Sequence, residues 1–424
     1  MSTVASAPRA PQLPPDVRPT GHVYARRRPE QTSLYAVVRD NLRTLYAAVE
    51  DGFAGAPLPD FVRKDLEGYL DCGLLCRGFA VFSCPGCPGE RHLVAFSCKS
   101  RAFCPSCLGR RMAETAADLV EDVLPRAPLR QFVLTLPHPL RARLGYDGKL
   151  LGAVCRVFSD SVLGWYRERL HKQGQGGAVL ALQRTSADLK LNPHVHGIFI
   201  DGVFVPDADG RPVFRQLPRL RTAEVADLMQ IIRARVLRFL QRRGVIDVSE
   251  EGMVLPDELA QREPAFAQLA AAAVSGLPPA GPELRRRPVV IPLPGRPTVQ
   301  IDAPLSVSSF GFSLHAATTA GAEDDRARQA LCKYVLRPPI ANEHVLLLPD
   351  DLVRIMLKRP FRDGTVAVDM DPLSLLCRLA AAVPPPGQHQ IRYAGVLAAA
   401  AKWRPLVLPP PPEDTNSSGA PPPV

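Results

Sequence analysis

Leu191-Asn192-Pro193-His194-Val195-His196-Gly197-Ile198-Phe199-Ile200-Asp201-Gly202 has the pattern of a turn, a β-strand and a tight Asp-Gly turn that leads into residues 203–205. Side chains alternate between the two faces of a strand, so His194 and His196 are expected to point the same way and Val195 the other way. Two imidazoles on one face of a rigid strand are half of a metal site. Two partly buried histidines satisfied by hydrogen bonds are the alternative, and the other motifs of the chain bear on the choice.

The composition is that of a globular protein with a polyanionic partner. The chain has 424 residues, and its 52 basic and 42 acidic residues leave a formal charge of +10. The length indicates two or three domains, and the charge favours nucleic acid as a partner, although charge alone does not exclude an acidic membrane. Because we find no N-terminal apolar segment and no long uncharged span, we expect a cytoplasmic protein with no membrane partner.

Seven of the ten cysteines lie between Cys72 and Cys107. Cys84-Pro-Gly-Cys87 and Cys104-Pro-Ser-Cys107 are two Cys-x2-Cys knuckles separated by 16 residues, a spacing typical of a tetrahedral structural Zn²⁺ site. Disulfides are the poorer interpretation in a chain without a secretion signal.

The remaining cysteines of this segment leave two interpretations open. Cys72 and Cys98, together with Cys76 and His92, are candidate ligands of a second zinc ion. Alternatively, Cys72 and Cys98 are small buried hydrophobic residues. Basic residues beside the knuckles, among them Lys99 and Arg101, are typical of a nucleic-acid-binding ribbon; a purely structural zinc clip is the alternative.

The predicted elements divide the chain into five parts and favour an α+β fold. In the central part, strands at 131–137, 178–183 and around His194–His196, with a helix over 149–170, suit an antiparallel sheet flanked by helices. The predicted parts are a disordered basic Pro-rich arm (1–32), a helical and zinc-binding domain (33–124), a central α+β domain with a Pro-rich insertion at about 276–298 (125–345), a C-terminal α/β extension (346–408) and a disordered tail (409–424).

Tyr334 lies in the last turn of a helix predicted over 324–336, which has acidic residues first and basic residues last and stops at Pro338-Pro339. Lys333 and Arg337 flank the tyrosine, where they can stabilise a phenolate and bind a phosphate. An ordinary helix-end aromatic packed against the core is the alternative.

Taken together, these segments resemble the rolling-circle insertion-sequence transposases of the HUH endonuclease superfamily, in the IS91-like group, over roughly Leu70 to Leu408. The order and spacing of several motifs carry the resemblance. These motifs are the cysteine segment ending in Phe96-Ser97-Cys98-Lys99-Ser100-Arg101-Ala102-Phe103-Cys104-Pro105-Ser106-Cys107, Phe132-Val133-Leu134-Thr135-Leu136-Pro137, Leu191-Asn192-Pro193-His194-Val195-His196, Gly311-Phe312-Ser313-Leu314-His315, Tyr334-Val335-Leu336-Arg337-Pro338-Pro339-Ile340 and Arg362-Asp363-Gly364-Thr365.

The resemblance implies a transposase that nicks single-stranded DNA at element ends and joins strands. Mg²⁺ or Mn²⁺ held by His194 and His196 would polarise a phosphate, and Tyr334, assisted by Arg337, would attack it and leave a 5′-phosphotyrosine. Gln183 on the neighbouring predicted strand is the candidate third ligand; a polar strand-end residue is the alternative. Asp201 would fall on the face opposite the histidines, and its Asp-Gly context explains it as a turn residue.

One feature distinguishes this chain from many relatives, and one absent motif bears on the mechanism. Ala330 stands one helical turn before Tyr334, where many relatives have a second tyrosine, so a one-tyrosine version is implied; Tyr393 is a weaker candidate nucleophile. We find no Walker-type loop, and strand displacement is therefore expected to come from the host replication machinery.

Three rival interpretations remain at this stage. A zinc-ribbon DNA-binding regulator explains the cysteines and the charge, but leaves the histidine pair and Tyr334 without a role. A metal-dependent nuclease that uses water would cleave DNA without a covalent adduct. An inactive transposase copy would keep the motifs without the activity.

Overall fold

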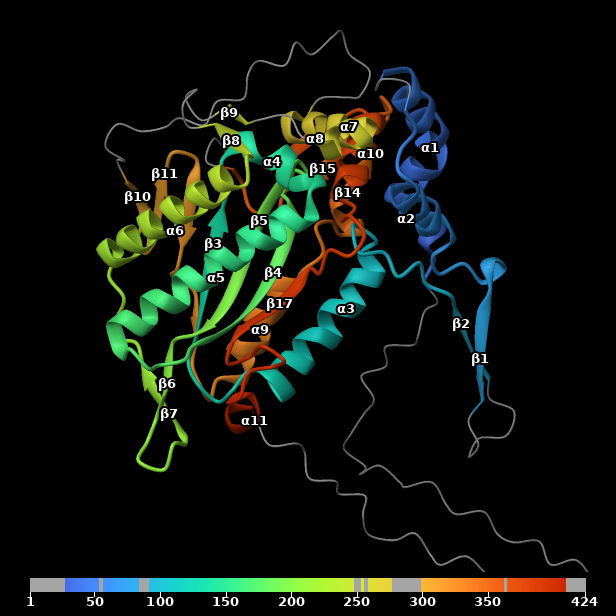
Figure 1. Cartoon of the computed structure of the whole chain (residues 1–424). Coiled ribbons are helices and arrows are strands. Elements are labelled where there is room, and N and C mark those ends of the chain that lie inside the picture. The colour runs from blue at the N-terminus through green and yellow to red at the C-terminus, as the bar shows by residue number, and fades with distance from the viewer. Residues whose placement is uncertain are drawn as a thin grey trace, which may run out of the picture.

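An eight-stranded sheet, in which every pair of neighbouring strands is antiparallel, forms the centre of the molecule (Figure 1). The computed structural model describes residues 27–52, 56–83, 91–247, 253–254, 258–276, 299–361 and 364–408. The strands along the sheet are β10 (Gln300–Ala303), β11 (Ser306–Ser309), β12 (Phe312–His315), β3 (Leu129–Thr135), β5 (Leu191–Ile200), β4 (Gly177–Thr185) and β17 (Ile391–Gly395), and β13 (Thr319–Ala320) also pairs with β3. The mixed helix and sheet fold with a central antiparallel sheet is the architecture predicted from the sequence.

The strand register places His194 and His196 at the middle of one face. His196 is opposite Val133 of β3 and Ala181 of β4, while His194 is opposite Gln183 of β4. Residues directly opposite each other in an antiparallel pair share a face. His315 of β12 is also opposite Val133, and it therefore lies on the histidine face two strands away from β5.

The other face of the sheet is closed by two long helices. α5 (Gly148–Leu170) and α6 (Thr222–Arg242) bury the alternate, apolar residues of β3, β4 and β5 (Figure 1). Phe199 is central, because its ring packs edge-to-face on Phe132 at 5.4 Å and on Phe158 at 5.8 Å between centroids. Most residues of β3, β4 and β5 are buried on both faces of the sheet, which explains why these strands are short apolar segments in the sequence.

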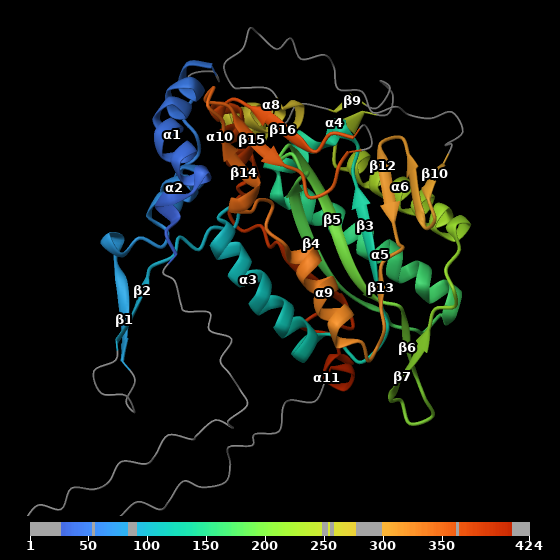
Figure 2. The ribbon, with the colours of Figure 1, turned by 180° about the vertical axis from the view of Figure 1, so that it is seen from behind.

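Helices cover only one end of the histidine face. α3 (Pro105–Asp118), the π-helix η3 (Leu119–Val123) and α9 (Asp325–Leu336) pack over Val179, Ile198 and Ile200 (Figure 2). α3 begins directly after the cysteine segment, with Cys104 at the N-cap and Pro105 at the first helical position, where proline is favoured.

The N-terminal and C-terminal segments share a second hydrophobic core. α1 (Ser33–Gly52) and α2 (Asp60–Asp71) pack with α8 (Pro264–Ser275), α10 (Pro372–Ala382) and the sheet of β14 (Val345–Leu347), β15 (Val353–Met356) and β16 (Ala367–Met370). The hairpin of β1 (Phe79–Ser83) and β2 (Arg91–Ala95) projects from this side (Figure 1). The other elements are η1 (Pro29–Gln31), η2 (Leu75–Arg77), α4 (His138–Tyr146), β6 (Gly202–Pro206), β7 (Pro212–Gln216), β8 (Ile246–Asp247), β9 (Met253–Val254), α7 (Glu258–Arg262), η4 (Asn342–His344) and α11 (Arg404–Val407). In the described ranges, no helix combines the length and apolar character needed to cross a bilayer.

Asp201 was expected to be a turn residue, but the structure shows that it is also a buried anion with its own partners. It is 4% exposed and accepts hydrogen bonds from the Arg130 guanidinium at 2.9 and 2.8 Å and from the Tyr166 hydroxyl at 2.9 Å. The chain does leave β5 here, but β6 pairs with β7. A Cβ on Gly202 would lie 2.2 Å from the Arg215 carbonyl oxygen, so this close approach of β7 explains the glycine.

Candidate active site

A cleft of about 850 Å³ opens on the histidine face. Segments far apart in the sequence line it: β3, β4, β5, the end of α9, the loop before α3, and residues 355–361 and 388–391. Among the described residues that line the cleft there is no Asp or Glu. Its cations are Arg101, Arg111, Arg184, Arg337, Lys358 and Arg359. A cleft with this charge suits a polyanion such as a phosphodiester chain.

His194 has one ring nitrogen fixed by the backbone. Its Nδ1 lies 2.7 Å from the Asn192 carbonyl oxygen, which can only accept, so Nδ1 carries the proton and Nε2 keeps a lone pair. Loss of hydration lowers the pKa of His194 below its ordinary value, although the Asn192 hydrogen bond opposes this shift. The imidazole is therefore neutral at neutral pH, which is the form that binds a metal ion.

His196 is almost completely buried, at 3% exposure, and its ring centroid is 4.9 Å from that of His194. Its Nδ1 contacts the Gln131 amide at 2.9 Å, whereas its Nε2 is buried without a hydrogen-bond partner in the described part of the chain. Burial, and then the neighbouring His194, lower the pKa of His196 to about 2. A neutral imidazole with an unsatisfied buried nitrogen fits a divalent ion at the histidine pair.

Tyr334 lies beside this pair, on the last turn of α9. The centroid of its ring is 5.9 Å from that of the His196 ring, and the two ring planes are inclined at 72°. Tyr334 is 39% exposed. The Arg337 guanidinium lies 4.5 Å from the Tyr334 ring centroid. Lys333, the other cation expected there, donates to the Gln329 amide oxygen at 3.1 Å and does not line the cleft.

Gln183 links the sheet to the tyrosine helix. Its Nε2 donates to the Val335 carbonyl at 2.7 Å, one residue after Tyr334. Its amide oxygen is then the atom left for a metal ion. Among the His, Cys, Asp and Glu residues described, the only group of three or more with ligand atoms within 4.8 Å of one another is a cysteine cluster. The geometry thus brings Gln183 into the same cleft as His194, and its role as a ligand stays a proposal.

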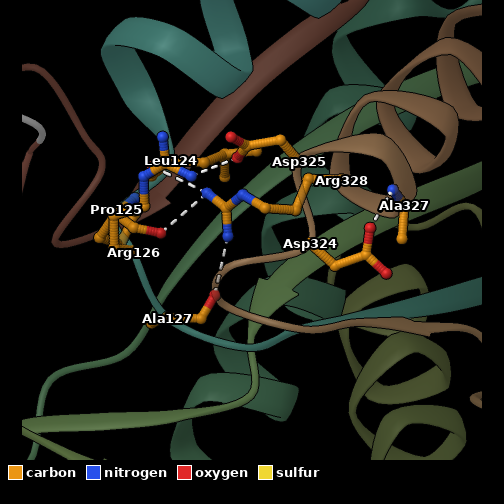
Figure 3. Close-up of polar contacts among 8 residues, drawn as sticks. All are labelled: Leu124, Pro125, Arg126, Ala127, Asp324, Asp325, Ala327 and Arg328. Carbon is orange, nitrogen blue, oxygen red and sulfur yellow. Dashed lines mark hydrogen bonds and ion pairs between the residues drawn. The ribbon is translucent and has the colours of Figure 1, made fainter.

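The N-terminal half of α9 is anchored by a buried cation (Figure 3). Arg328 is fully buried and donates to the carbonyl oxygens of Leu124, Pro125 and Ala127 at 2.9–3.0 Å. The Asp324 side chain caps the helix by accepting from the Ala327 amide at 2.9 Å. Together with the Gln183 contact at the other end, these bonds fix the position of the helix that presents the tyrosine.

Other residues with functional positions were not singled out from the sequence. Gln131 contacts His196, His315 lines the cleft, and Lys358 and Arg359 add charge to its wall. Gln131, Val133 and Thr135 alternate along one strand, and this pattern could have predicted that Gln131 shares a face of the sheet with them. No sequence pattern indicated that Lys358 and Arg359 line the cleft, because tertiary packing alone brings them there.

Tyr393, the weaker candidate nucleophile, does not line the cleft. It lies on the edge strand β17 opposite Val179, with the Arg404 guanidinium 5.7 Å from its ring centroid.

The cysteine cluster consists of Cys72, Cys98, Cys104 and Cys107. Three of the Sγ–Sγ distances are 3.5, 3.6 and 3.7 Å. Four thiolates about 2.3 Å from a tetrahedral Zn²⁺ would be about 3.8 Å apart, so the cluster fits that ion. The hydrogen bond from Cys104 lowers the pKa of Cys72 to about 6, and the same neighbour lowers the pKa of Cys107.

This grouping differs from the one expected from the two knuckles. Cys104 and Cys107 are joined by Cys72 and Cys98, the pair assigned to a possible second site, while Cys84 and Cys87 lie outside the described residues. The reason is tertiary: Cys72 is the C-cap of α2 and Cys104 the N-cap of α3, so two helix ends meet. Cys76 and His92 are exposed and are not in the cluster.

The cysteine cluster is connected directly to the cleft. Arg101 lies between Cys98 and Cys104, and its guanidinium donates to the Gln388 carbonyl at 3.2 Å. Its own carbonyl accepts from Gln390 Nε2 at 2.9 Å. The loop held by the cysteines therefore forms a wall of the cleft.

Comparisons with known proteins agree with this arrangement. Residues 177–404, more than half of the chain, match the family described as "Putative transposase", and residues 43–136 match the family described as "Transposase zinc-binding domain". Over 141 residues the chain is 31% identical to a transposase for insertion sequence element IS801 from Pseudomonas savastanoi pv. phaseolicola, and the alignment covers 33% of each protein. No solved structure matches. The histidine pair and Tyr334 fall in the first matched region and the four clustered cysteines in the second, and the chain therefore belongs to the family of IS91-like transposases.

Proposed function

We propose that the protein is an HUH-type endonuclease and strand transferase that nicks single-stranded DNA at element ends during rolling-circle transposition. One observation carries the proposal: a cationic cleft, with no carboxylate among its described lining residues, contains the Nε2 of His196, which has no partner in the described part of the chain, with His194 beside it and the partly exposed Tyr334 at its edge. A regulator that only binds DNA would not require a tyrosine packed against two desolvated histidines.

The tyrosine chemistry follows from these positions. A divalent ion, Mg²⁺ or Mn²⁺, bound by His194 and His196 with Gln183 as the proposed third ligand would supply electrophilic polarisation of a phosphate oxygen. The Tyr334 oxygen attacks the phosphorus and loses its proton as the bond to phosphorus forms. The bond between phosphorus and the 3′ oxygen breaks, and that oxygen takes up a proton and leaves as a 3′-hydroxyl. The 5′-phosphotyrosine retains the bond energy for strand joining.

Cations of the cleft hold the DNA during this step. Arg337 lies over the tyrosine ring, where its guanidinium can bind the phosphate under attack and offset its developing charge. Lys358 and Arg359 on one wall and Arg101 and Arg111 in the zinc module can bind flanking phosphates. The expected partners are thus the single-stranded element ends and the target strand.

The proposal includes a one-tyrosine mechanism in a cytoplasmic enzyme. Tyr334 is the only tyrosine among the described residues lining the cleft, and Ala330 lies one turn earlier on α9. Two alternating tyrosines would require the second from another protomer. Strand displacement is assigned to the host replication machinery. We propose a helical and zinc-binding domain (33–124), a nuclease domain (125–345) and a C-terminal extension (346–408) whose strand β17 completes the central sheet.

The test is a covalent-adduct assay with the purified full-length protein. Single-stranded DNA with the element end, labelled at its 3′ end, is incubated with Mn²⁺ and separated on a denaturing gel. The wild-type protein should give a slowly migrating labelled adduct that is absent in Tyr334→Phe and retained in the matched control Tyr393→Phe. Cleavage without an adduct would favour a nuclease that uses water. Binding without cleavage would favour a zinc-ribbon regulator or an inactive transposase.

A further inference from the structure

Gln131 lies on β3, next to the buried ring of His196. Gln131 is 1% exposed, and its amide nitrogen Nε2 lies 2.9 Å from His196 Nδ1. The amide nitrogen and oxygen are similar in size, so a half-turn of the amide would bring the oxygen to the same place, and the contact is compatible with either direction of hydrogen bonding. The direction matters because it decides which ring nitrogen of His196 carries the proton.

The two directions have different consequences at the cleft. If the amide nitrogen donates to Nδ1, the proton of His196 resides on Nε2, where it is a buried donor without a partner and cannot bind a metal ion. If the amide oxygen accepts from Nδ1–H, Nε2 presents its lone pair to the cleft. His194 already has the second arrangement, with the Asn192 carbonyl as the acceptor.

We propose that Gln131 is a positioning residue that accepts the Nδ1 proton of His196 through its amide oxygen and thereby presents the Nε2 lone pair to the divalent ion. This inference rests on the metal ion of the proposed function. Second-shell partners of this kind fix the tautomer and orientation of metal-binding histidines. An amide does so without adding a negative charge to a cleft that has no lining carboxylate in the described residues.

The uncharged acceptor makes a specific prediction for substitutions. Gln131→Leu removes the acceptor at similar volume, whereas Gln131→Glu keeps an acceptor and adds a charge. We expect Gln131→Leu to weaken Mn²⁺ binding by about 10- to 100-fold. Gln131→Glu should bind Mn²⁺ at least as tightly as the wild type and bind single-stranded DNA more weakly, because a buried negative charge beside His196 lowers the positive potential of the cleft.

The experiment measures Mn²⁺ affinity of the full-length, zinc-loaded protein from the electron paramagnetic resonance signal of free Mn²⁺. Gln390→Leu is the matched control, since it removes an amide from the same cleft whose bond goes to the Arg101 carbonyl. It should bind Mn²⁺ as the wild type does. Circular dichroism checks that each variant is folded. Nitrogen-15 spectra of the metal-free wild type should show His196 protonated at Nδ1, with the signal identified by its loss in His196→Ala.

Several results would overturn the inference. These are wild-type protein that binds no Mn²⁺, Gln131→Leu with wild-type affinity, Gln131→Glu as weak as Gln131→Leu, or a wild-type His196 protonated at Nε2. The nitrogen-15 result decides the question even if a variant fails to fold. Failure of the proposed function looks different: Mn²⁺ affinities follow the expected order, but wild-type protein forms no adduct with DNA.

Discussion

Arg130, Asp201 and Tyr166 form a buried polar cluster that ties β3 to the end of β5 and to α5. The side chains of Arg130 and Asp201 are 10% and 5% exposed, and the Asp201 carboxylate accepts all three hydrogen bonds of the cluster. Asn at position 201 would keep the shape of the side chain but remove its charge. Its amide nitrogen would also face a donor of Arg130 or Tyr166, because all three bonds point toward the carboxylate.

The loss in free energy of unfolding caused by Asp201→Asn can be estimated in two ways. Breaking a buried ion pair by removing one partner leaves the other charge uncompensated and costs about 3–5 kcal/mol. Two hydrogen bonds to a charged group, at about 1.5–3 kcal/mol each, give a similar range. The Ala316 carbonyl, which accepts from Arg130 at 2.9 Å, offsets little because it is already bonded in the native protein. We expect a loss of about 3–5 kcal/mol.

Urea unfolding monitored by Trp165 fluorescence measures this loss. The Trp165 ring is 5.6 Å from the Tyr166 ring, and a Trp403→Phe background removes the second tryptophan. Tyr166→Phe is the control, because it removes one neutral donor and should cost about 1 kcal/mol. If Asp201→Asn lies within about 1 kcal/mol of the wild type, the carboxylate does not hold the strands together and the reasoning is refuted.

Three further predictions concern the zinc site, the tyrosine helix and acid stability. Cys72→Ser should lower the zinc content measured by atomic absorption, whereas the exposed Cys76→Ser should leave it unchanged; equal losses would contradict the four-cysteine site. Arg328→Met should cost about 2–4 kcal/mol in urea unfolding, because three buried carbonyls lose their donor, and unchanged stability would argue against this anchor. The pKa of His196 is lowered to about 2 in the folded protein, so on acidification the unfolded chain takes up a proton on this histidine before the folded protein does. The free energy of unfolding, measured in the presence of a chelator, should therefore fall below about pH 6.5, by up to about 1.4 kcal/mol per pH unit. His196→Gln should flatten this dependence, and an equally steep curve for that variant would count against it.

Local sequence patterns predicted the elements that form the centre of the site. Short apolar segments predicted β3, β4 and β5, and the strand register then placed Gln183 opposite His194. Helical spacing and terminal charges predicted α9 with Tyr334 in its last turn. These features depend on neighbours within one turn or one strand, which is the range over which a sequence pattern carries information.

Features set by distant segments were not predictable in the same way. Cys72 joins Cys104 and Cys107 because the ends of α2 and α3 converge, and the regular Cys-x2-Cys spacing pointed to a different partner pair. Asp201 looked like a turn residue because its partners, Arg130 and Tyr166, are 71 and 35 residues away in the sequence. A single sequence gives no sign of such contacts.

Three separate parts of the fold form the cleft, so a substitution in any of them is expected to change its shape. The sheet supplies the histidines, α9 supplies the tyrosine, and the cysteine-bound loop supplies Arg101, which is tied to the strand region near β17 through Gln388 and Gln390. A change that loosens the cysteine cluster is thus expected to move a cleft wall, although the cluster holds none of the reacting groups. The histidine pair lies on the sheet, and the helix that carries Tyr334 is held to β4 by the Gln183 bond and to the segment before β3 by Arg328. Loss of zinc should therefore weaken DNA binding more than Mn²⁺ binding. The proposed Mn²⁺-binding nitrogens lie on the sheet, whereas several phosphate-binding cations lie on the segments that surround the cleft.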